Sequence, residues 1–183
     1  AYMAMGGIPY YWSFLKKGQS VAQNFDRMFF QPGGELTQEF NALYVSLFKK
    51  PRHHIAIITA LAKKKQGLLR EDLLKSSKLP DNAEFSKALQ ELEHCGFIRK
   101  FTAIGKKTKD ATFQLIDNYT LFYFDFISEN VNGDEHFWSS SASTSIHYSW
   151  AGRAFERVCM QHIKQIKEAL GFSAVVSSVH SWC

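Results

Sequence analysis

The chain has 183 residues, of which 45% are hydrophobic and 21% are charged, and its formal net charge is +5. This length suits one domain or two small ones, and the many aliphatic and aromatic side chains favour packed helices over a disordered tail. No apolar run reaches the roughly 18 residues that a membrane-spanning helix needs, so we expect no such helix.

The positive charge is concentrated in the middle of the sequence. Residues 51–117 carry 13 Lys or Arg against 8 Asp or Glu, which gives +5, whereas residues 1–50 stand at +2 and residues 118–183 at −2. An anionic partner is therefore expected at the middle segment. Cys95, Cys159 and Cys183 are odd in number and widely spaced, which favours free thiols in a reducing, cytoplasmic compartment.

The first fifty residues are predicted to form three helices, at 9–17, 21–30 and 35–50. Ser20 is a suitable N-cap for the second helix, and the sequence Gln31-Pro32-Gly33-Gly34 ends it. No capping residue precedes the apolar start at residues 1–8. At the other end, residues 172–182 have the composition of a strand without a partner. We therefore expect both ends to be cut from a longer protein.

The middle segment predicts three helices followed by a two-stranded hairpin. The first helix begins at Pro51 and is closed by Gly67, the second covers 69–75, and the third is capped by Asn82 and ends at Gly96. Strands are expected at 97–101 and 111–116, joined by a polar tip at 105–110. This order is typical of a winged helix-turn-helix, in which the hairpin is the wing.

The last third begins with a helix at 119–127 that is apolar nearly all round and must be buried on several sides. A Ser-rich linker is expected at 139–145, and a long helix at 150–170.

The third helix of the middle segment and the wing contain the candidate contacts to nucleic acid. Outward positions of the helix hold three carboxylates, at Glu84, Glu91 and Glu93, and these would repel phosphates. The wing differs, because it gathers five cations on one small hairpin. The candidate binding residues are therefore Arg99, Lys100, Lys106, Lys107 and Lys109 on the wing, with Lys87 and Gln90 on the helix.

The sequence shows no motif for catalysis or for metal binding. It lacks the phosphate-binding loop of nucleotide hydrolases, a serine nucleophile motif, and metal-ligand pairs at helical spacing. We expect no catalytic residue, metal or cofactor in this chain, and no enzymatic activity.

Several stretches together resemble one ATPase family. The first half carries Met5-Gly6-Gly7-Ile8-Pro9-Tyr10-Tyr11 and Ser20-Val21-Ala22-Gln23-Asn24-Phe25-Asp26, and the second half carries Leu92-Glu93-His94-Cys95-Gly96-Phe97-Ile98 and Trp150-Ala151-Gly152-Arg153-Ala154-Phe155-Glu156. These are similar to the lid end, winged helix and C-terminal region of AAA-type, STAND-like ATPases of archaea and Bacteroides-type bacteria.

The resemblance implies a parent protein that binds ATP and Mg²⁺ through a core lying before this region. It also implies that Glu156 is a possible metal residue of a restriction-endonuclease-like domain, active only in the full protein. The expected fold is mainly α with a small β wing: a helical ATPase-lid fragment at 1–50, a winged helix-turn-helix at 51–117, and the start of a truncated α/β domain at 118–183.

Two functions fit these observations. The first is a regulatory segment of a P-loop ATPase that binds nucleic acid, with DNA favoured. The alternative is a protein–protein docking segment that couples the ATPase core to its C-terminal domain. An acidic third helix that packs on a neighbour favours docking, whereas one that lies open beside the basic wing favours nucleic acid.

Overall fold

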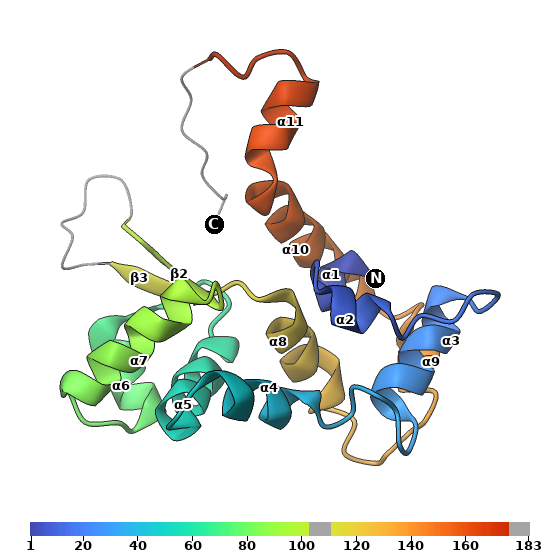
Figure 1. Cartoon of the computed structure of the whole chain (residues 1–183), viewed down its shortest axis with the longest axis horizontal. Helices are drawn as coiled ribbons and strands as arrows, with labels where there is room; N and C mark the ends of the chain where they lie inside the picture. The colour runs from blue at the N-terminus through green and yellow to red at the C-terminus, as the bar shows by residue number, and fades with distance from the viewer. Residues whose placement is uncertain (103–110, 176–183) are drawn as a thin grey trace.

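The structure of the chain is a computed structural model that describes residues 1–102 and 111–175. It is mainly helical with one small antiparallel sheet, which confirms the expected mainly α class with a minor β element (Figure 1). Within the described ranges, no helix is long and apolar enough to cross a membrane.

The first fifty residues form short helices around aromatic side chains. Ser20 caps α3 through a capping box in which its hydroxyl accepts from the Gln23 amide, as expected for this position. The helix at 21–30 is confirmed, but its second half is a π-helix. The helices expected at 9–17 and 35–50 are both shorter than expected. The elements are α1 (Tyr2–Met5), α2 (Pro9–Trp12), α3 (Val21–Phe25), the π-helix η1 (Asp26–Phe30) and α4 (Glu39–Leu47).

The middle segment contains the three expected helices and both expected strands. Asn82 caps α7 by accepting from the Phe85 amide, and the four side chains expected to face inward, Phe85, Ala88, Leu89 and Leu92, are all buried. The elements are α5 (Pro51–Ala62), β1 (Leu68–Leu69), α6 (Arg70–Ser77), α7 (Ala83–His94), β2 (Ile98–Phe101) and β3 (Thr112–Leu115).

The strand β1 was not foreseen from the sequence. It adds a third strand to the hairpin, in the order β1-β3-β2, with Leu68 opposite Phe113 and Ile98 opposite Leu115. Two residues are too few to show the alternation that marks a strand, and the apolar spacing of the sequence places Leu69 in the following helix instead.

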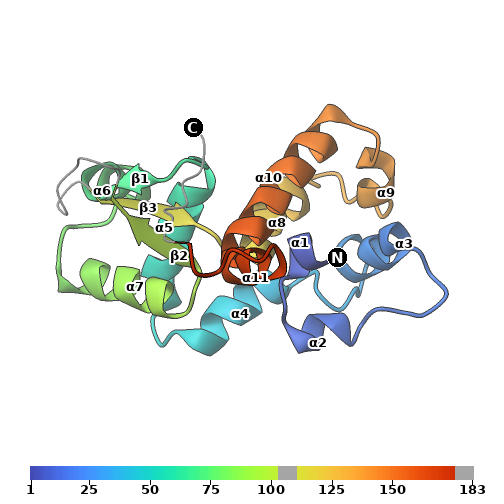
Figure 2. The ribbon, with the colours of Figure 1, turned by 90° about the horizontal axis from the view of Figure 1, so that it is seen from above.

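The last third contains the aromatic helix as α8 (Asn118–Phe122), which continues as the π-helix η3 (Tyr123–Ile127). Phe122 is fully buried, and its ring lies 5.0 Å from that of Phe29 and 5.8 Å from that of Trp150. Two views show α8 between the sheet-bearing middle segment and the helices at the two ends of the chain (Figures 1 and 2).

Three expectations for this last third are wrong. Residues 139–145 are not a linker, because α9 (Phe137–Ser141) occupies their first part and Thr144 caps α10 (Ser145–Gln161). The long helix is divided in two, since the chain turns at His162 before α11 (Ile163–Ala169). Residues 172–175 form a turn rather than a strand, and the rest of that expected strand lies outside the described residues.

Glycine is required where the chain enters β1. Gly67 has φ +94°, and a Cβ atom there would lie 2.6 Å from the carbonyl oxygen of Phe113. Gly96, which ends α7, also has a positive φ of +77°, but a Cβ atom there would meet nothing within 4 Å.

We predict that Gly67→Ala lowers the free energy of unfolding by more than Gly96→Ala does. Both changes place a side chain at positive φ, which costs about 1–3 kcal/mol, but only Gly67→Ala also pushes β3 away. Urea denaturation of the two variants measures the difference. Equal losses would show that the approach of Gly67 to β3 is not a close constraint.

Candidate functional site

The outer face of α7 is open, and its acidic residues are partly neutralised from within the chain. Glu84 Oε1 lies 3.2 Å from Lys50 Nζ, and this hydrogen-bonded cation lowers the pKa of Glu84. Glu91 lies 2.8 Å from Nε2 of the buried His54 and 3.8 Å from Lys87 Nζ. Two of the three carboxylates that opposed phosphate binding therefore already have cationic or hydrogen-bonding partners.

The two candidate residues on α7 are both exposed. Lys87 and Gln90 point away from the buried face formed by Phe85, Ala88 and Leu89, as their spacing predicts. Their exposure leaves them free to contact a partner that approaches α7 from solvent.

The candidate residues on β2, Arg99 and Lys100, both contact other side chains of the sheet. The Nε atom of Arg99 donates to Gln114 Oε1 at 2.8 Å, and its guanidinium carbon lies 5.4 Å from the centroid of the Phe101 ring. Lys100 is exposed, with its ammonium 5.9 Å from the centroid of Phe113. The other three wing candidates, Lys106, Lys107 and Lys109, lie outside the described residues.

Arg99 and Glu156, which are 57 positions apart in the sequence, line the same cleft. The cleft has a volume of about 560 Å³ and lies between the sheet and α10. Its charged lining residues are Lys65, Arg99, Arg153, Glu156 and Arg157.

Arg153 and Arg157 were not singled out in the sequence, although their four-residue spacing puts them on one face of a helix. Their place in the same cleft as Arg99 could not be predicted from the sequence, because the cleft is formed by segments that lie far apart along the chain. Burial lowers the pKa of Arg157, and the nearby Asp125 carboxylate opposes this shift.

Glu156 is exposed on α10, and the structure does not gather further acids around it. Among the described residues there is no group of three His, Cys, Asp or Glu side chains that could hold a metal ion. Glu156 instead lines the cleft together with Arg153 and Arg157, which lie on either side of it in the sequence.

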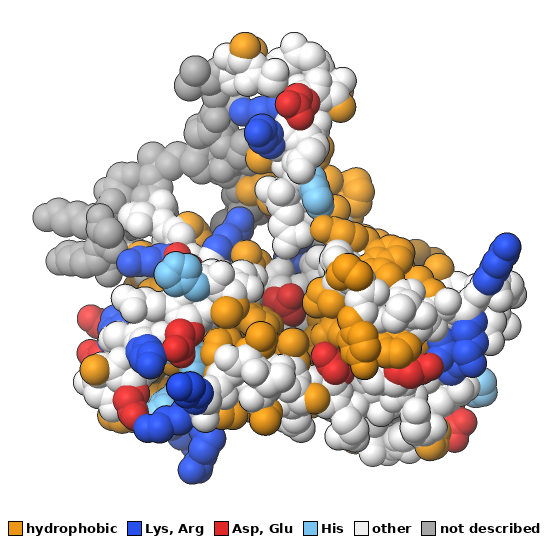
Figure 3. All heavy atoms as spheres, viewed as in Figure 1, with side chains coloured by type: hydrophobic (Ala, Val, Ile, Leu, Met, Phe, Trp, Pro, Cys, Tyr) orange, Lys and Arg blue, Asp and Glu red, His pale blue; other side chains and the backbone are white. Residues whose placement is uncertain are grey.

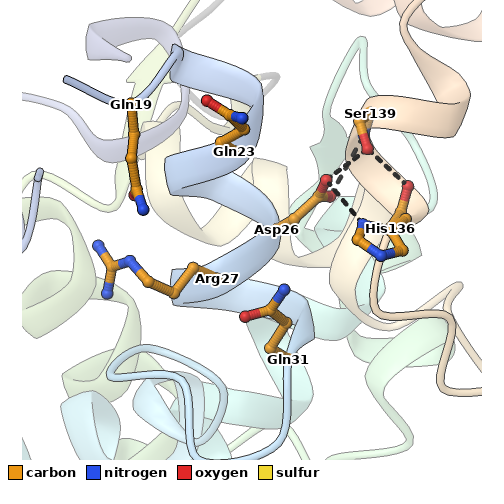
Figure 4. A pocket seen from close by; sticks show the side chains of 7 residues that line it. All are labelled: Gln19, Gln23, Asp26, Arg27, Gln31, His136 and Ser139. Atoms are coloured by element: carbon orange, nitrogen blue, oxygen red, sulfur yellow. Dashed lines mark hydrogen bonds and ion pairs between the residues drawn. The ribbon is translucent and has the colours of Figure 1, made fainter.

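A second pocket, of about 390 Å³, is lined by polar side chains that include Asp26 (Figure 4). Asp26 is only 3% exposed, and its Oδ1 accepts from the amides of Trp138 at 3.0 Å and Ser139 at 3.2 Å. The Ser139 hydroxyl donates to its other oxygen. The carboxylate thus caps the start of α9 from a distant segment, so its acceptor capacity is used by the fold.

No protein-family model, curated protein or solved structure matches the chain.

We predict that Asp26→Ala lowers the free energy of unfolding by about 2–3 kcal/mol. The substitution leaves the buried Trp138 amide without an acceptor, which costs roughly 1–3 kcal/mol, and it also removes the acceptor of the partly buried Ser139 amide. Urea denaturation followed by tryptophan fluorescence measures the loss.

Two control variants separate this bond from general effects at the pocket. Ser139→Ala removes only the hydroxyl donor and should cost about 1 kcal/mol. Gln19→Ala changes an exposed residue at the pocket wall and should stay within about 0.5 kcal/mol. If Asp26→Ala is as mild as Gln19→Ala, Asp26 does not hold α9 in place.

Proposed function

We propose that residues 51–117 form a winged helix-turn-helix that binds nucleic acid, with DNA favoured, in a regulatory segment of a P-loop ATPase. α6 and α7 would be the helix-turn-helix, and the hairpin β2–β3 the wing. The order α5-β1-α6-α7-β2-β3, with one three-stranded antiparallel sheet, supports this assignment.

The observation on which the proposal rests is the open, partly neutralised face of α7 beside a basic strand. An exposed helix can enter the major groove only if its charge does not repel the phosphates. The partners of Glu84 and Glu91 reduce that repulsion, and Lys87 and Gln90 remain exposed between them. Gln90 offers the amide geometry that suits a base edge, whereas Lys87 suits a phosphate.

In this proposal the cations of the wing contact the phosphate backbone. Lys100 on β2 is exposed, and Lys106, Lys107 and Lys109 follow it in the sequence between the two strands of the expected hairpin. Phosphate contacts set affinity and position without reading sequence, so binding should be weakly specific and strongly dependent on salt. The chain itself would not be catalytic, and ATP and Mg²⁺ would belong to the ATPase core of the parent protein.

A docking role is the second candidate, and an apolar surface favours it. Tyr10 and Trp12 on α2 are 60% and 39% exposed, and hydrophobic side chains gather over α1 and α2 in a space-filling view (Figure 3). Exposed apolar patches of this kind often mark a protein contact. In the resembled family the neighbour would be the ATPase core, which precedes this region.

We predict that the chain binds a duplex DNA of about 20 base pairs with an affinity that falls steeply with salt. The logarithm of the binding constant should fall with a slope of about −0.9 per phosphate contacted when plotted against the logarithm of salt concentration. Replacing Lys106, Lys107 and Lys109 with Ala should flatten this slope by about one per lysine in phosphate contact. Fluorescence anisotropy at several salt concentrations measures both quantities.

The matched control replaces three exposed lysines outside the middle segment, Lys16, Lys17 and Lys164, with Ala. It removes the same charge, so it separates a local contact from a general effect of net charge. A slope near zero for the unaltered chain, or equal flattening in both triple variants, would contradict the nucleic-acid proposal and leave docking as the better account.

A further inference from the structure

We propose that the cleft between the sheet and α10 is a nucleotide site, in which Arg153 and Arg157 hold a phosphate group and Phe101 contacts the base. This site is separate from the open face of α7 and does not depend on the binding of duplex DNA there, although it shares Arg99 of β2 with the wing. The shared chemistry, a phosphate next to a flat aromatic base, can come from a free nucleotide or from one unit of a single strand.

The charge of the cleft favours an anion. Four cationic side chains line it, and Glu156 is the single carboxylate among the described lining residues. Lys65 is already paired with Asp125 at 2.6 Å, which leaves three arginines to act on a bound group. A guanidinium offers a planar set of donors that matches the oxygens of a phosphate, so arginines are well suited to this ligand.

Arg157 lines the cleft with a guanidinium that is incompletely paired, and its two buried nitrogens reach a ligand there only after a change of side-chain rotamer. Its Nε and Nη2 atoms are buried, and neither has a hydrogen-bond partner among the described residues. Buried donors normally have partners, because burying one without an acceptor is costly. Two of the three carboxylates near Arg157 are already engaged, Asp125 by Lys65 and Asp117 by the amide of Thr120 at 2.7 Å, whereas the third, Glu156, is exposed.

The spacing of the two arginines on α10 points the same way. Arg153 and Arg157 are four residues apart, so they lie on one face of the helix, and both line the cleft. Like charges at this spacing repel, and the charge of Arg153 contributes to lowering the pKa of Arg157. A phosphate between them would replace this repulsion by two attractive contacts.

The aromatic and apolar lining indicates a nucleotide rather than a bare inorganic anion. Phe101 lines the cleft and is 37% exposed, so part of its ring is open to a base. Stacking on an aromatic ring tolerates any base, because every base has a flat face. Leu121 and Met160 add apolar surface, and a volume of about 560 Å³ lies within the range of small-molecule sites.

Glu156 has a defined place in this site. Its carboxylate lies on α10 between the two arginines in the sequence and lines the same cleft. A carboxylate accepts hydrogen bonds, so it suits a sugar hydroxyl or a base amino group rather than the phosphate.

Isothermal titration calorimetry of the whole chain tests the proposal with three probes: AMP, inorganic phosphate and a single-stranded oligothymidine of 12 nucleotides. We expect AMP or the oligonucleotide to bind at least tenfold more tightly than inorganic phosphate at equal ionic strength. Binding of AMP identifies a free nucleotide as the source, whereas binding of the oligonucleotide alone identifies a single strand. Failure of both to bind at millimolar concentration overturns the proposal.

Variants place the binding in the cleft. Arg153→Gln, at an exposed position, should weaken binding of the tighter probe at least tenfold without changing the melting temperature, and Arg153→Lys should restore part of the loss. Lys164→Gln, an equal loss of charge at an exposed position on α11, should change it less than twofold. An unchanged affinity in Arg153→Gln would contradict the assigned site.

Arg157→Lys supplies a second test, because it keeps the positive charge while losing the planar donors. It should weaken binding of the same probe, and circular dichroism before titration shows whether the variant is folded. If it is unfolded, the affinities of Arg153→Gln and Phe101→Leu for the same probe test the site instead, and both should be weaker than that of the unaltered chain. Arg153→Gln should leave the duplex binding of α7 and the wing unchanged, so failure of this proposal and failure of the proposed function can be told apart.

Discussion

The packing of aromatic rings around Phe122 is the constraint on which the arrangement of the chain depends. Its ring contacts Phe25 at 5.6 Å, Trp138 at 5.2 Å and Trp150 at 5.8 Å, so one side chain joins α3, α9 and α10 through α8. Aromatic pairs in such tilted and edge-on geometries add to the stabilisation gained from burial. The helices before residue 31 and those after residue 117 therefore share one core, although the middle segment separates them in the sequence.

The same helix fixes the position of the sheet. The amides of Ile116 and Asp117 both donate to the carbonyl of Phe97, and the Asp117 carboxylate caps α8 by accepting from Thr120. β3 is therefore joined to α8 by a hydrogen-bonded turn. α8 in turn packs against α10 through the ring contact of Phe122 with Trp150. This connection sets the positions of the sheet and α10, which form two walls of the cleft, and Leu121 of α8 also lines it.

The sequence predicted the elements whose signals are local. Asn82, Ser20 and Pro51 marked helix starts, and the spacing of Phe85, Ala88 and Leu92 gave the buried face of α7. It failed where long-range contacts decide the structure. α9 forms in a Ser-rich stretch because Asp26 accepts from its first amides, and β1 exists because β3 lies beside it. The cleft was missed for the same reason, since α10 and β2 come to line it through the β3–α8 junction and the aromatic core.

The hydrogen bond from the Trp138 amide to Asp26 joins residues that are 112 positions apart, so it cannot form until most of the chain has been synthesised. A ribosome adds about 5–20 residues per second, so on the order of ten seconds separates the emergence of the two partners. During that interval Phe25 and Phe29 have each other as aromatic partners, but both lack Phe122. We expect the newly made N-terminal helices to keep one side of these rings uncovered until α8 and α9 leave the ribosome.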